Sequence, residues 1–295
     1  VNGVINIITR SARDSQGGLL TLGAGLEQQG LVGLRYGGQL SADTWFKIYG
    51  TAQSLDGGLT TTGGHAGDDL ANGSIGFLLE KEMGGTDILT LQADAYRSQH
   101  QSTIRWPVLN GVTNVLTDET LKYQGEALRL GWLRHLGDGE HLSFKLYYDY
   151  TDGDNPLLGE KLHQLSAEFE HAIVLGSDHV VVWGLGARYY HDEAVPGPVL
   201  TLSNLTEEWG VYSGFVQDEI TLIPERLKLT VGTKVEYQEF TGMEWQPSLR
   251  LAFTPYEHQT WWAAVSRAVR TPSRINRGLV GTFAATQFPP PIGLR

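Results

Sequence analysis

The sequence predicts an all-β protein, folded as an antiparallel transmembrane β-barrel. About thirteen segments of roughly 10 residues alternate between two kinds of side chain, and this length allows a tilted strand to cross a bilayer. In each segment one face is apolar and the other is polar or small, which is typical of a wall between lipid and a wet interior. The connections alternate between short and long, as the two ends of such barrels do.

The segment Trp245–Arg274 shows this pattern most clearly. Its two runs place apolar residues on one parity: Pro247, Leu249, Leu251 and Phe253 in the first run, and Trp261, Ala263 and Val265 in the second. Pro255–His258 separates the runs, so we predict a hairpin. In a soluble β-sandwich the polar face would have to enter the core or the apolar face would have to meet water. A membrane barrel has lipid on one side and a wet interior on the other, so both faces have a suitable environment.

The remaining strands follow in chain order after a polar linker, Ser11–Gly17. Their alternating apolar positions begin at Leu20, Phe46, Leu89, Leu142, Val181 and Leu229. The clearest strand is His141–Asp152, where Phe144, Leu146 and Tyr148 share one parity and Lys145 lies on the other. Period-2 alternation of this kind indicates two-faced strands.

The connections predict which end of the barrel faces which side. The short ones are Ser41–Asp43, Met83–Thr86, Gly137–Gly139, Gly176–Asp178, Pro224–Arg226 and Pro255–His258, and the long ones include Ser54–Leu70, Ser98–Thr120, Asp152–Lys161 and Asp192–Glu208. Outer-membrane barrels have short periplasmic turns and long extracellular loops, so we assign the two sets accordingly. Because an odd number of antiparallel strands cannot close a barrel, we expect the chain to be a piece of a longer protein.

Composition narrows the choice of partners. The formal net charge is -11, with 22 Lys and Arg against 33 Asp and Glu, which argues against a nucleic-acid partner. The sequence has no cysteine, so it forms no disulfide and no thiolate metal site. It has no apolar run long enough for a transmembrane helix.

The sequence carries no catalytic or metal-binding pattern, and we predict no cofactor and no enzyme activity. His163 and His171 share a strand face, but eight residues at roughly 3.3 Å each separate them by about 26 Å. In the acidic stretch from Asp149 to Glu160, Pro156 and the absence of glycine at the required position break the spacing of an EF-hand loop. Ser266 has no histidine or acid that the sequence places beside it.

Aromatic residues give two further expectations. Those near strand ends fit an interfacial girdle, or ordinary strand packing: Trp45, Trp132, Tyr148, Tyr150, Trp183, Tyr189, Tyr237 and Trp261. Arg105, Trp106, Tyr123 and Trp209 instead fall in or beside the predicted long loops. There they could bind an aromatic, anionic iron chelate by stacking and charge, or simply pack the loops.

Four stretches of the sequence resemble one family. The run QPSLRLAFTP with the following WWAAVSRAVRTPSR, preceded by FVQDEITL at 215–222 and LKLTVGTKVEY at 227–237, resembles the middle of the barrel of a TonB-dependent outer-membrane receptor. VNGVINIITR at 1–10 resembles the last strand of that family's plug domain. The stretches stand in the family's order, so we divide the chain into the end of a plug with its linker, 1–17, and a partial barrel, 18–295.

The resemblance implies a function. The family's barrel has about twenty-two strands, sits in the outer membrane of Gram-negative bacteria and imports ferric siderophores or a similar large chelate such as cobalamin, with energy supplied through the TonB complex. Glu236, on the polar face, is then expected to pair with plug arginines inside the barrel. The alternative is a self-contained channel or enzyme barrel of about 12 to 14 strands without a plug, and a soluble β-sandwich is a third possibility.

Overall fold

The computed structural model describes residues 9–107 and 114–281, which are almost entirely β-structure. The predicted plug strand, at 1–10, lies almost wholly outside the described residues. The elements are η1 (Arg13–Ser15), β1 (Gly17–Gly23), β2 (Gln28–Ser41), β3 (Thr44–Leu55), β4 (Leu70–Met83), β5 (Asp87–Pro107), β6 (Asn114–Gly137), β7 (Glu140–Asp154), β8 (Leu158–Leu175), β9 (His179–Pro196), β10 (Leu200–Leu202), β11 (Thr206–Ile223), β12 (Leu227–Gln238), β13 (Gly242–Tyr256), β14 (Gln259–Ser266), α1 (Arg274–Gly278) and β15 (Leu279–Gly281).

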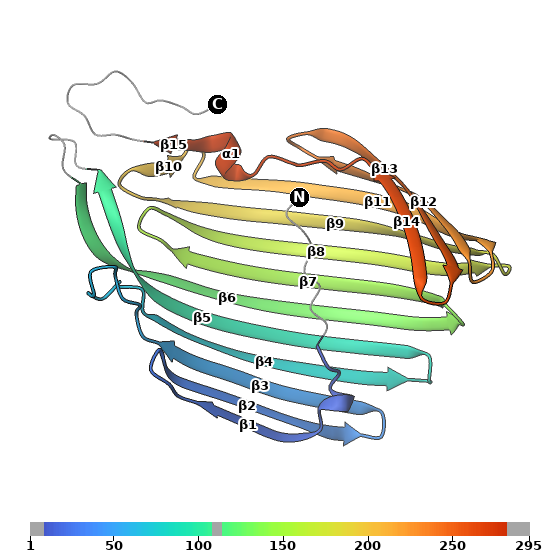
Figure 1. Cartoon of the computed structure of the whole chain (residues 1–295), viewed down its shortest axis with the longest axis horizontal. Coiled ribbons are helices and arrows are strands. Elements are labelled where there is room, and N and C mark those ends of the chain that lie inside the picture. The colour runs from blue at the N-terminus through green and yellow to red at the C-terminus, as the bar shows by residue number, and fades with distance from the viewer. Residues whose placement is uncertain (1–8, 108–113, 282–295) are drawn as a thin grey trace.

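One antiparallel sheet dominates the fold. Its 13 strands run from β1 to β14 in chain order, with β10 left out, and each pairs with the strand before and after it. Figure 1 shows the continuous sheet, with β10 and β15 forming a separate two-stranded pair beside one end of it. The all-β antiparallel class and the strand count predicted from the sequence are confirmed. Within the described residues, β1 and β14 are the edges of the sheet.

The sheet has two chemically different faces. Residues paired across neighbouring strands share a face, and we call the face that carries Lys145 and Glu236 the inner face and its opposite the outer face. On the outer face of the hairpin, the register pairs Leu249 with Val265, Leu251 with Ala263 and Phe253 with Trp261, as the alternation predicts. The outer-face leucines and valines of the hairpin and of other strands are exposed: Leu128, Leu130, Leu165, Leu185, Val231, Leu249 and Leu251. An apolar face that meets no protein is the mark of a wall built against lipid.

The two ends of the sheet differ in their connections. At one end the strands join through the short turns 42–43, 84–86, 138–139, 176–178, 224–226 and 257–258. At the other end the connections include the long segments 56–69 and 197–205 as well as the short turns 24–27, 155–157 and 239–241. In the first turn, hydroxyls of Ser41 and Thr44 donate to the Asp43 carboxylate and hold its pKa below the usual value. Gly139 and Gly176 adopt the left-handed φ that such tight turns require.

The predicted long loop Ser98–Thr120 is mostly strand. β5 continues to Pro107 and β6 begins at Asn114, and the two remain in register from Asp87 to Pro107. Asp152–Lys161 is reduced to the three-residue turn 155–157, so its prediction as a long connection is wrong, and Asp192–Glu208 is shortened by the ends of β9 and β11. Polar residues on both faces hid these extensions, because backbone pairing there continues without apolar alternation.

The linker before β1 packs against the inner face at the short-turn end. The Ala12 N–H donates to Glu80 Oε2 at 2.6 Å, and Arg13 pairs with Glu82 at 2.9 Å. The Arg13 guanidinium lies over the Trp45 ring, 5.0 Å from its centroid. Trp45 is therefore buried on the inner face under η1, and its expected place in a girdle is wrong. No helix in 9–107 or 114–281 has the length and apolarity that a membrane crossing demands.

Candidate ligand-binding site

The four residues predicted to bind a ligand lie on strands rather than in loops. The backbone of Arg105 and Trp106 continues β5, paired with Leu116 and Val115 of β6. Tyr123 lies in β6 and Trp209 in β11. All four lie toward the end of the sheet that carries the longer connections. Tyr123 and Trp209 lie beside the predicted loops as expected, whereas the predicted loop position of Arg105 and Trp106 is wrong.

Tyr123 and Trp209 each join a separate aromatic cluster of the inner face. Tyr123 stacks on His100 of β5 with ring centroids 5.8 Å apart and an interplanar angle of 6°. Trp209 stacks on Tyr190 of β9 at 4.7 Å and 17°, and its ring lies 6.0 Å from that of Phe240. The structure does not bring the two clusters together, so they offer two flat surfaces on one wall.

The chain after β14 returns to the end of β9 and β11 that holds the Trp209 cluster. We call residues 267–281 the strap. Ser273 caps α1, since its side chain accepts the Asn276 N–H and the Asn276 side chain accepts the Ser273 N–H. β15 then pairs with β10 in register from Leu200 with Gly281 to Leu202 with Leu279. Figure 1 shows α1 and β15 beside β10.

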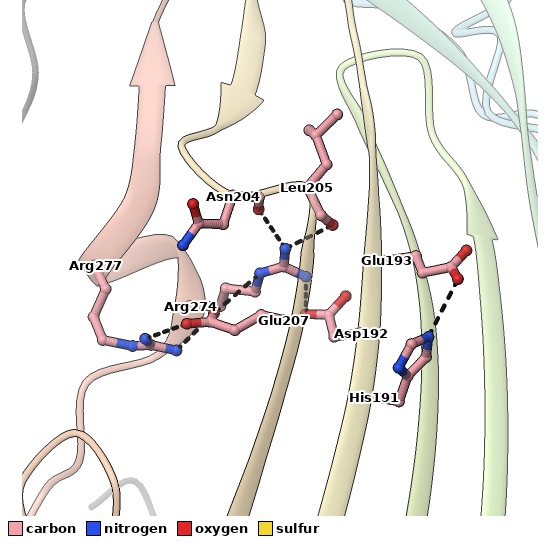
Figure 2. Close-up of polar contacts among 8 residues, drawn as sticks. All are labelled: His191, Asp192, Glu193, Asn204, Leu205, Glu207, Arg274 and Arg277. Atoms are coloured by element: carbon pink, nitrogen blue, oxygen red, sulfur yellow. Dashed lines mark hydrogen bonds and ion pairs between the residues drawn. The ribbon is translucent and has the colours of Figure 1, made fainter.

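A buried ion network fastens the strap to the wall, as Figure 2 shows. Arg274 Nη1 lies 2.6 Å from Asp192 Oδ2, and these side chains are only 8% and 2% exposed. Arg274 Nη2 donates to the backbone carbonyls of Asn204 and Leu205. The Glu207 carboxylate accepts hydrogen bonds from both terminal nitrogens of Arg277, with Nη1–Oε1 at 2.8 Å and Nη2–Oε2 at 3.0 Å. The two guanidinium groups face the carboxylates of Asp192 and Glu207, and this pairing offsets the cost of burying these charges.

The network touches the aromatic cluster. The Arg277 guanidinium lies over the Phe240 ring, 3.3 Å from its centroid, and Phe240 is tilted against Trp209. Asp192 Oδ1 and Arg277 Nε have no hydrogen-bond partner among the described residues. The inner wall thus combines stacked aromatic faces with a guanidinium group that is paired to Glu207, an arrangement that suits a flat aromatic ligand.

Glu236 lies on the inner face, two residues before the end of β12 at Gln238. It borders a hollow of about 370 Å³ together with Lys145, Glu168, Arg188 and Lys234. Lys234 Nζ pairs with Glu236 Oε2 at 2.6 Å. The hollow contains charges of both signs, so a polar segment of protein suits it better than an apolar ligand.

Histidines and carboxylates of the described residues form no group of three that could hold a metal ion. His163 contacts His191 rather than His171, with ring centroids 6.0 Å apart on the outer face. His191 is hydrogen-bonded to Glu208 at 2.8 Å and to Glu193 at 3.2 Å. Each imidazole nitrogen of His191 therefore already has a carboxylate partner.

Sequence reasoning missed the residues of the network: Asp192, Glu207, Phe240, Arg274 and Arg277. One signal was present, because Ser273 followed by Asn276 has the spacing of a helix cap. The pairing of Arg274 with Asp192 was not readable, since 82 positions separate them and no periodicity connects a returning strap with a strand.

The fold and the two faces define a class before any comparison is made: this chain forms part of the wall of an antiparallel membrane β-barrel. The family model described as "TonB dependent receptor-like, beta-barrel" matches residues 19–291. The chain belongs to that family. No curated protein sequence matches the chain.

Several solved structures have the same fold. The chain is similar to the ferric enterobactin receptor PfeA of Pseudomonas aeruginosa, with 18% identity, a TM-score of 0.74 and coverage of 93% of this chain and 47% of that one. For the siderophore receptor PirA of the same organism the identity is 20%, the TM-score 0.64 and the coverage 83% and 40%. For the siderophore receptor PirA of Acinetobacter baumannii the identity is 13% and the TM-score is 0.66, with coverage of 86% of this chain and 42% of that one. The chain thus spans less than half the length of these receptors.

Proposed function

We propose that this chain is part of an outer-membrane receptor of a Gram-negative bacterium that imports a ferric siderophore. The observation that carries the proposal is the joined cluster of Tyr190, Trp209, Phe240 and Arg277 on the inner wall, toward the end with the longer connections. Stacking on the Trp209 and Tyr190 rings favours an iron chelate with aromatic ligand groups. Siderophore receptors among the similar folds support the same ligand class.

The proposal includes a plug and an energy source. Residues 1–17 are the end of the plug and its linker, and the charged hollow around Glu236 receives arginines of that plug. A barrel filled by a folded domain passes no large chelate until work moves the domain. The TonB complex supplies that work, so binding and transport are separable steps.

The experiment uses the full-length receptor. Titration with a ferric catecholate and a ferric hydroxamate siderophore should give tighter binding of the catecholate, because only its ligand groups are aromatic. Trp209→Ala should weaken catecholate binding roughly tenfold, since loss of one stacked aromatic contact costs about 1 to 3 kcal/mol. Trp245→Ala is the matched control, because Trp245 is an exposed outer-face tryptophan.

The second part separates the two clusters and the two steps. Arg105→Ala with Trp106→Ala tests the β5 end, and Tyr123→Ala tests the His100 stack. Deleting the TonB-binding segment of the full-length protein should leave siderophore binding intact and abolish uptake. Uptake that persists without that segment would instead favour the passive channel, and unchanged binding in every variant would exclude this wall as the site.

A further inference from the structure

The outer face of β2–β5 is hollowed. Two adjoining hollows of about 1130 and 790 Å³ share Val32 and Ala52. Small residues line them on the outer-face parity, and bulky apolar residues border them. The small residues are Gly50, Ala52, Gly73, Ala93 and Ala95, and the bordering ones are Leu22, Leu34, Ile48, Ile75, Phe77 and Leu128. The two hollows form an apolar groove on the face that meets lipid.

A polar quartet stands beside the groove on the same face. The register pairs Arg97 with Gln124 and Gln99 with Lys122, so these four side chains occupy adjacent positions of β5 and β6. Arg97 also pairs with Gly73 and lines the smaller hollow, as does Gln99. Neither Arg97 nor Lys122 forms an ion pair with any residue in 9–107 or 114–281. Two unpaired cations thus lie at the end of an apolar groove.

The quartet lies at a defined depth. Arg97 is ten residues along β5 from Asp87, which follows the short turn 84–86. Ten residues at about 3.3 Å each, in a strand tilted by roughly 40°, rise about 25 Å, which matches the apolar band of such barrels. The quartet therefore sits at the boundary of the band nearer the long connections. Glu126, paired with Ala95, lines the larger hollow one pair deeper in the membrane than Gln124, and its carboxylate repels an anion from that side of Arg97.

We propose that this surface binds a phosphorylated lipid of the outer leaflet. Its phosphate lies between Arg97 and Lys122, the two glutamine amides contact its sugar headgroup, and its acyl chains occupy the groove. The inference rests on the outer-membrane location in the proposed function but not on siderophore transport. In an outer membrane the leaflet at this end is lipopolysaccharide, whose lipid A anchor has phosphates, sugars and several acyl chains.

The test uses full-length receptor, delipidated in detergent and then offered lipid A, lipid A stripped of phosphate, or phosphatidylethanolamine. Native mass spectrometry measures the lipid retained. Arg97→Ala with Lys122→Ala should reduce lipid A retention roughly tenfold or more, because charged hydrogen bonds are lost. The charge-preserving pair Arg97→Lys with Lys122→Arg should retain the lipid. Lys145→Ala, which removes an inner-face cation, is the matched control.

A second variant tests the groove without touching a charge. A Cβ on Gly73 would make ordinary contacts at 3.5 and 3.9 Å, so Gly73→Val fits the fold while filling the floor, and it should lower lipid A retention. Heat-modified migration in gels confirms that each variant is folded. Equal retention of lipid A and its phosphate-free form, or of lipid A and phosphatidylethanolamine, would overturn the proposal. So would full retention by the double alanine variant.

Siderophore titration of the same preparations keeps the two proposals apart. Loss of lipid A with unchanged siderophore binding supports the lipid site. Unchanged lipid A retention with normal siderophore binding refutes the lipid site alone. Wild-type protein that retains lipid A in a phosphate-dependent way yet binds no siderophore supports the lipid site and contradicts the proposed ligand.

Discussion

Arg274 is the residue on which the strap depends. It is buried, faces Asp192 and Glu207, and donates to two backbone carbonyls of the segment between β10 and β11. Removal of one partner from a buried pair leaves the other charge uncompensated, which costs about 3 to 5 kcal/mol. Arg274 is therefore the most buried of the contacts that hold the strap on the wall, beside the Arg277–Glu207 pair and the β10–β15 pairing.

We expect Arg274→Ala to release the strap without unfolding the sheet. Hydrogen–deuterium exchange of full-length protein should show faster exchange at 273–281 and 200–205, with little change in β4–β8. Arg270→Ala is the control, because Arg270 belongs to the same strap but is exposed and forms no ion pair with a described residue. Equal exchange in the two variants would mean that the β10–β15 pairing and the Arg277–Glu207 pair hold the strap without Arg274.

The two faces make a second prediction at the same scale. Leu146→Arg or Val231→Arg places a charge on the outer face and should lower the free energy of unfolding by about 2 to 4 kcal/mol at mid-membrane. Lys145→Ala on the inner face should cost far less, because the residue lines a polar hollow. Refolding into lipid vesicles from urea measures the difference. Similar costs on both faces would disprove the two-faced wall.

At the scale of elements, η1 packs very closely against β2. A Cβ on Gly37 of β2 would overlap the Ser15 carbonyl, which belongs to η1. We therefore expect Gly37→Ala to push η1 off the inner face, at a cost of about 1 to 3 kcal/mol for overpacking. Limited proteolysis should then cut the linker near Arg10 or Arg13 more quickly. Gly33→Ala is the matched control, since its Cβ would meet Thr21 at an ordinary 3.5 Å.

The sequence predicted elements wherever apolar alternation continued and failed where it stopped. The hairpin β13–β14 has the predicted faces, because lipid on one side enforces the alternation of Leu249, Leu251 and Phe253. β5 and β6 extend further than predicted, since water and polar groups on both sides of their ends remove that constraint. Arg105 and Trp106 were assigned to a loop for this reason.

For the whole molecule, the class and the order of strands were predictable, but the candidate site was predictable only in part. Trp209 and Tyr123 were identified by residue type and position, whereas their partners Tyr190, Phe240 and His100 depend on the register between strands. The ion network joins residues from two distant parts of the chain. Composition and periodicity do not indicate which distant segments come into contact, so the ion network could be identified only from the folded structure.

The order of the sheet affects how such a wall can assemble. Every strand of the 13-stranded sheet pairs with its chain neighbours, apart from the omission of β10, so each addition closes only a short loop and costs little chain entropy. The sheet can therefore form sequentially, one hairpin at a time, because each completed strand provides the hydrogen-bonding edge for the next. An error in this sequential pairing would persist, because a one-residue register slip at one strand would invert the faces of all strands added after it. Some tyrosine rings lie directly over a glycine of the neighbouring strand, as Tyr49 does over Gly76 and Tyr96 over Gly125. These contacts form only in the correct register, so they would favour it over a shifted one.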